Sequence, residues 1–139
     1  MNKTSWLVKA AVIFVHAFIG WGVCGAIIFI GRSVTTMQTT LIIHAFAVPV
    51  VFALLSLSYF RFFNYTPPLW TAAIFTAIPF LLDLFVIAPF AEKSFAMFTS
   101  PQSILGTWIP FALIFTTTYT VGRWVAKKSP LPASSANSL

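Results

Sequence analysis

The chain has 139 residues, of which 59% are hydrophobic and only 7% are charged. Soluble domains carry about 25% charged residues, so this composition excludes the soluble class. Several apolar runs of about 20 residues predict a membrane protein instead. The net charge of +6 comes from basic residues beside the apolar runs, which indicates the lipid bilayer and its headgroups as partners rather than nucleic acid. The single cysteine, Cys24, excludes an intrachain disulfide.

The first predicted membrane span covers about residues 6–30. Lys3 and Lys9 make the start of the chain similar to that of a signal peptide. The apolar run after Lys9 has about 20 residues, however, whereas the apolar core of a signal peptide has about 7–15. No small-residue cleavage site interrupts the run, so we expect a helix that is retained.

Three further spans are predicted, over about residues 40–60, 68–90 and 103–125. Thr66 before Pro67 is typical of a helix start, because a hydroxyl can cap the helix and proline suits its first position. Residues 126–139 are rich in polar residues and proline, which predicts a disordered cytoplasmic tail.

Four spans with short loops predict an all-α, four-transmembrane-helix antiparallel bundle with up-down-up-down topology, as a single domain over residues 1–125. One side of this bundle holds six basic residues, and the other side holds two, Arg32 and Lys93. This excess places both termini in the cytoplasm and the protein in the inner (plasma) membrane. The six basic residues are Lys3, Lys9, Arg61, Arg123, Lys127 and Lys128.

An acid in the third span is the feature that bears most directly on function. Asp83 is one of only two acidic residues and lies in an apolar run between Pro79 and Pro89. A charge at mid-span costs about 2.5–3.5 kcal/mol on insertion scales. Three alternatives are open: a proton or cation site, a structural acid paired with Arg32 or His44, and a permanently protonated acid that donates one hydrogen bond.

Counting along each span gives every polar side chain an approximate depth, because a helix rises about 1.5 Å per residue. Asp83 comes out about 5 Å toward the outer face. His44 and Thr107 come out at about 10 Å and Cys24 at about 9 Å in the same direction. His16 lies about 3 Å inward of the centre. The polar groups of all four spans therefore gather in the outer half of the bundle.

These depths predict an outer-half site around Asp83. The proton or ligand groups of this site are Asp83, His44, His16 and Arg32, and its lining residues are Cys24 and Thr107. Prolines within the spans support a polar cavity at this depth, because each proline frees the carbonyl four residues before it. These prolines are Pro49, Pro79, Pro89 and Pro110.

The two histidines raise the question of a haem or a metal ion. Two axial histidines must lie at one level, but the depths of His16 and His44 differ by about 13 Å. His44, Asp83 and Cys24 could supply metal ligands, but no HxxxH, CxxC or ExxH spacing accompanies them. No serine motif, glycine-rich phosphate loop or acidic pair is present either. We therefore expect no metal, no cofactor and no enzyme activity.

Two four-helix families differ from this chain in their key residues. Small multidrug exporters carry a glutamate in the first helix, where this chain has His16, and thiol-oxidising proteins carry paired cysteines. The stretches GRSVTTMQTTLIIHAFAVPVVFALLSLSYF, FNYTPPL, LLDLF and LGTWIPF resemble uncharacterised small four-helix bacterial integral membrane proteins, over about residues 16–122. That resemblance implies a multi-pass bacterial membrane protein and implies no site residues.

The leading hypothesis is a small multi-pass membrane protein that acts as a proton-linked transporter or carrier subunit. Asp83 would carry the proton, His44 would be its partner, and His16 would be a deeper relay. The bundle is small for a complete transport path, so this hypothesis predicts a homo-oligomer or a larger membrane partner. The alternative is a non-transporting structural or accessory protein, in which Asp83 pairs with Arg32 or His44 to fix helix packing.

Overall fold

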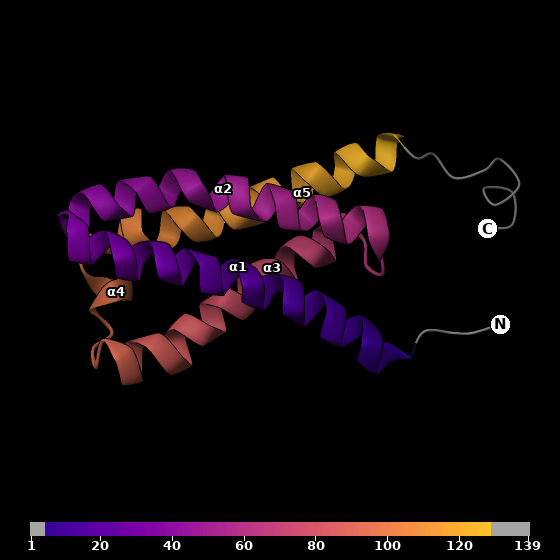
Figure 1. Cartoon of the computed structure of the whole chain (residues 1–139). Coiled ribbons are helices and arrows are strands. Elements are labelled where there is room, and N and C mark those ends of the chain that lie inside the picture. Colours follow the sequence, from indigo (N-terminus) through magenta and orange to yellow (C-terminus); the bar gives the residue numbers. More distant parts are fainter. Residues whose placement is uncertain (1–4, 129–139) are drawn as a thin grey trace, which may run out of the picture.

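The computed structural model describes residues 5–128, which are helical with short connections and contain no strand. Four of its helical stretches are long and apolar enough to cross a membrane, over residues 6–34, 37–62, 68–91 and 104–128. The predicted all-α class with four long apolar helices is therefore confirmed (Figure 1). The elements are α1 (Trp6–Val34), α2 (Met37–Phe62), α3 (Pro68–Leu82), η1 (Asp83–Ala91), α4 (Ala96–Thr99), η2 (Ile104–Trp108) and α5 (Ile109–Lys128).

The last helix is longer than its predicted span. It ends at Lys128 rather than at residue 125, so residues 126–128 of the predicted disordered tail are helical. Lys127 and Lys128 lie in its last turn, where cationic side chains interact favourably with the negative end of the helix dipole. Residues 129–139 of the predicted tail lie outside the described residues.

The start of α3 differs by one residue from the predicted cap. Pro67 is the cap residue and Pro68 is the first helical residue, so the Thr66 hydroxyl does not cap the helix. That hydroxyl instead lies 2.9 Å from the Tyr59 hydroxyl and 2.6 Å from the Thr71 hydroxyl. Thr66 therefore links the end of α2 to the first turn of α3.

Each long stretch packs against two others. The neighbouring pairs are α1 with α2, α2 with α5, α5 with α3, and α3 with α1. Aromatic rings fill the centre: Phe75 lies 6.2 Å from Phe52 and 5.8 Å from Tyr59, centroid to centroid, and all three side chains are fully buried. Close approach of α1 to α2 requires Gly20, because a Cβ at that position would lie 2.5 Å from Cζ of Phe52.

One end of the bundle carries the short helix α4 (Figure 1). At this end α1 finishes at Val34, α2 begins at Met37, and α4 connects η1 to η2. We call it the α4 end. The opposite end holds the link between α2 and α3 and the last turn of α5.

Candidate functional site

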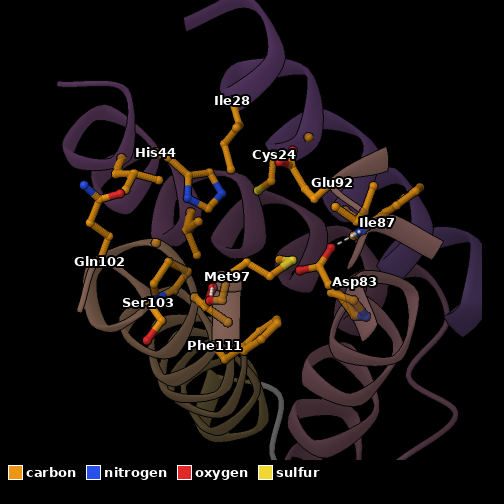
Figure 2. A pocket seen from close by; sticks show the side chains of 18 of the residues that line it. Cys24, Ile28, His44, Asp83, Ile87, Glu92, Met97, Gln102, Ser103 and Phe111 are labelled. Carbon is orange, nitrogen blue, oxygen red and sulfur yellow. Dashed lines mark hydrogen bonds between the residues drawn. The ribbon is translucent and has the colours of Figure 1, made fainter. Parts of the chain in front are cut away.

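A cavity of about 370 Å³ lies at the α4 end, among all four long helical stretches. Most of its wall is apolar, and it includes two prolines, Pro79 and Pro110, and two glycines, Gly25 and Gly106. A limited set of polar or charged side chains also lines it (Figure 2). These are Trp21, Cys24, Arg32, His44, Asp83, Glu92, Ser100, Gln102, Ser103 and Thr107.

Asp83 lines this cavity and is held by a residue of α1. The indole Nε1–H of Trp21 donates a hydrogen bond of 2.8 Å to Oδ1 of Asp83 (Figure 2). No other residue among 5–128 forms a hydrogen bond or an ion pair with this carboxylate. A carboxylate has about four acceptor positions, so Trp21 satisfies only part of its capacity.

The backbone changes its helical form at Asp83. The α-helical segment α3 ends at Leu82, and the wider π-helical segment η1 begins at Asp83 and contains Pro89. A second π-helical segment, η2, ends two residues before Pro110. Proline removes one hydrogen bond and clashes with the carbonyl four residues earlier, and a wider turn relieves that clash. Single π-helical turns often occur at functional sites, and both of these segments line the cavity.

His44 faces the same cavity from α2. Its side chain is 5% exposed, and Nδ1 has no hydrogen-bond partner among the described residues. Figure 2 shows the imidazole and the Asp83 carboxylate directed toward the same space, with the Met97 side chain between them in this view. Most buried polar atoms have a protein or water partner, so Nδ1 of His44 is an exception among the described residues.

Cys24 and Thr107 complete the wall near these two residues. The Cys24 thiol is buried and lines the cavity from α1. The Thr107 hydroxyl donates a hydrogen bond of 2.6 Å to the Met97 carbonyl, which fastens η2 to α4. Depth counting places four side chains within roughly one helical turn of each other, and all four line this cavity. They are Cys24, His44, Asp83 and Thr107.

One alternative predicted that Arg32 pairs with Asp83. The structure shows no such pair among the described residues. Nη1 of Arg32 lies 2.9 Å from Oε1 of Glu92, and both side chains are exposed. Both also line the cavity, so this ion pair lies at the cavity rim. The pairing of Asp83 with His44 is likewise not formed. Asp83 is the first residue of η1, whereas Glu92 follows its last residue. Glu92 therefore lies at the α4 end, where α1 also ends and where Arg32 reaches it.

His16 is not among the residues that line the cavity, so the structure does not bring this predicted relay residue together with Asp83. Its Nδ1 bonds to the Val12 carbonyl at 2.8 Å, within α1. Its ring packs against Tyr59, Phe63 and Phe75, at centroid distances of 5.6, 5.4 and 6.5 Å. His16 is a packing residue among aromatic rings.

Two residues of the site were missed by the sequence reasoning. Trp21 carries an N–H group far from either end of an apolar span, and such a group needs an acceptor. Asp83 was the one acid predicted within a span, so this pairing could have been inferred from the sequence. Glu92 is the only other acid in the sequence, and Arg32 is one of two basic residues predicted on the same side of the bundle. Their pairing could therefore also have been inferred from the sequence.

A metal site is not formed by the described residues. Within residues 5–128, no group of three or more His, Cys, Asp and Glu side chains lies close enough together to hold a metal ion. His44, Asp83 and Cys24 share the cavity wall without forming such a group. The cavity therefore offers one carboxylate outside the Arg32–Glu92 ion pair, one imidazole and mostly apolar walls.

Comparison of the chain with protein-family models, with curated proteins and with solved structures finds no match. The resemblance to small bacterial membrane proteins stays a prediction. We therefore argue the function from the chemistry of the cavity.

Proposed function

We propose that this chain is a small multi-pass membrane protein whose cavity at the α4 end exchanges a ligand for a proton on Asp83. It would serve as a proton-linked transporter or carrier subunit. One observation supports this proposal above the others: the Asp83 carboxylate faces a cavity and has a neutral donor, Trp21, but no cationic partner among residues 5–128.

A carboxylate in this position has two ways to avoid an uncompensated charge. It can take up a proton, or it can bind a cationic or hydrogen-bonding ligand from the cavity. Burial of an unpaired charge is costly, and ionisable groups within membrane helices are functional candidates for that reason. Alternation between these two states is the chemical requirement of a proton-linked carrier.

The other ionisable groups around the cavity leave this role to Asp83. Arg32 and Glu92 are engaged with each other at the rim. His44 and Cys24 line the wall from α2 and α1, and neither hydrogen-bonds to the carboxylate. No described neighbour therefore neutralises Asp83 by direct contact.

Membrane placement is part of the proposal. All four long stretches have the length and apolarity of membrane spans. Large apolar side chains point outward from them, including Phe46, Leu54 and Phe85. We propose up-down-up-down topology in the inner (plasma) membrane, with the α4 end outward and both termini in the cytoplasm. The excess of basic residues at the opposite end supports this orientation.

A bundle of this size would complete a transport path as a homo-oligomer or with a larger membrane partner. We propose no enzyme activity, because the cavity combines a single free carboxylate with a single imidazole. The competing structural role, in which Asp83 fixes packing through Arg32, receives no support from the Arg32–Glu92 ion pair.

Transport into proteoliposomes with an imposed pH gradient tests the proposal. Three probes share a phenyl group and differ in charge: benzyltrimethylammonium, benzenesulfonate and phenyl glucoside. We expect the gradient to drive accumulation of at least one probe by the wild type and by Thr76→Val, a control on α3 outside the cavity. Asp83→Asn should abolish it. The proposal fails if no probe accumulates, or if Asp83→Asn transports as well as the wild type.

A further inference from the structure

We infer that the cavity at the α4 end binds a small lipophilic organic cation, such as an aromatic or alkyl ammonium ion. This inference rests on the proposed function, because it takes Asp83 as the group that exchanges a proton for the ligand. It adds the chemical class of that ligand.

The charges around the cavity favour a cation. Three side chains in its wall belong to residue types that normally carry a full charge near neutral pH: Arg32, Asp83 and Glu92. The 2.9 Å ion pair cancels Arg32 against Glu92. Asp83 remains, and the described wall contains no uncommitted arginine or lysine. An anionic ligand would therefore meet a carboxylate without a free cation to offset it, whereas an ammonium ion would supply the missing counter-ion.

The walls favour an organic cation over a metal ion. Trp21 and Phe111 line the cavity with aromatic side chains, and ring faces attract ammonium groups by about 0.5–2 kcal/mol. The volume of about 370 Å³ accommodates a small organic molecule. A metal ion would need several oxygen, nitrogen or sulfur ligands at once, and the described residues assemble no such group.

The same walls disfavour a polyol. A sugar would bring many hydroxyl groups, each of which needs a hydrogen-bond partner after burial. The Thr107 hydroxyl donates to the Met97 carbonyl, and the Trp21 N–H donates to Asp83. Methyl or alkyl groups on nitrogen need no such partner, so they suit a wall that is mostly apolar.

His44 adds a second polar side chain to this wall. Its imidazole lines the cavity and is directed into the same space as the carboxylate (Figure 2). A ligand whose charge faces Asp83 would therefore lie beside this ring, whose buried Nδ1 has no partner in residues 5–128. Met97 has a flexible side chain that can reshape this part of the cavity for ligands of different shape.

Direct binding to the purified full chain in detergent micelles tests the inference. Equilibrium dialysis with benzyltrimethylammonium should show saturable binding, and benzenesulfonate and phenyl glucoside should bind at least about tenfold more weakly. Asp83→Asn should weaken cation binding by roughly tenfold or more. Thr76→Val, which changes a polar residue of α3 outside the cavity, should bind like the wild type.

Two results would overturn the inference: binding of the sulfonate or glucoside as tight as that of the cation, or unchanged cation binding by Asp83→Asn. If Asp83→Asn fails to fold, competition decides instead. Acidification should then displace the cation from the wild type, and lack of displacement would contradict the inference. Cation binding without transport would support the inference and end the transport proposal. Asp83-dependent transport of only the sulfonate or the glucoside would support the transport proposal and overturn the cation inference.

Discussion

The indole N–H of Trp21 donates a 2.8 Å hydrogen bond to Oδ1 of Asp83, and this contact joins α1 to the first residue of η1. A neutral donor fixes the orientation of a carboxylate without cancelling its charge. The contact therefore holds Asp83 toward the cavity and leaves its charge available to a proton or a ligand.

The bond between Trp21 and Asp83 should appear as an energetic coupling. A double-mutant cycle of Trp21→Phe and Asp83→Leu, which removes the acceptor, should give a coupling free energy of about 0.6–2 kcal/mol, in the range of hydrogen bonds between membrane helices. Unfolding in detergent would measure it. Trp70→Phe provides a control, because Trp70 is exposed on α3 and makes no side-chain hydrogen bond with a described residue. A coupling near zero would show that the bond does not hold Asp83.

The ion pair at the rim should couple Arg32 to Glu92 and not to Asp83. Exposed pairs contribute about 0.2–1 kcal/mol, so the cycle of Arg32→Gln with Glu92→Gln should give a value in that range. The cycle of Arg32→Gln with Asp83→Asn should give a value near zero, because the two residues form no ion pair. Denaturation of the three single and two double variants measures both couplings. A larger coupling with Asp83 would favour the structural role.

Replacement of His44 by leucine should cost little stability. Nδ1 has no described partner, so the substitution removes a buried polar atom without breaking a hydrogen bond. Ser56→Ala provides the contrast, because it leaves the fully buried Thr118 hydroxyl without its 3.1 Å partner and should cost about 1 kcal/mol. Thermal unfolding of both variants decides. A larger loss in His44→Leu would mean that the imidazole holds the fold together.

Two neighbouring glycines should respond oppositely to the same substitution. Gly20→Ala places a methyl group 2.5 Å from the Phe52 ring, so α1 and α2 must move apart, at a cost of about 1–3 kcal/mol. Gly22→Ala meets nothing within 4 Å and should leave stability unchanged or raise it slightly. Unfolding of the two variants under one condition compares them. Equal effects would contradict the close packing at Gly20.

The depth of a side chain along its helix could be predicted from the sequence. Which neighbouring helix or cavity that side chain faces was harder to predict. A constant rise per residue places Cys24, His44 and Asp83 at similar levels, and these side chains line one cavity. His16 shares a helix face with Cys24 by simple counting, but its ring turns to pack against Tyr59 and Phe63. Its position shows that a depth gives only one of the coordinates that define a contact.

The connections near the cavity explain most of the remaining differences. Apolarity and length identify the four spans, but they carry no signal for α4 or for the Thr107 bond to the Met97 carbonyl. Prolines predicted irregular helices, yet not that Pro89 and Pro110 would accompany wide π-helical turns. These turns change the register of the side chains that follow, so Glu92 could not be placed at the rim by counting.

The central claim is that a proton and an organic cation compete for Asp83. Proton release on binding, measured in a weakly buffered solution of the purified protein over a series of pH values, tests it most directly. Where Asp83 is protonated, the account predicts release of about one proton for each benzyltrimethylammonium ion bound by the wild type. It predicts no release from Asp83→Asn. Cation binding without proton release at any pH, or equal release from Asp83→Asn, would contradict it.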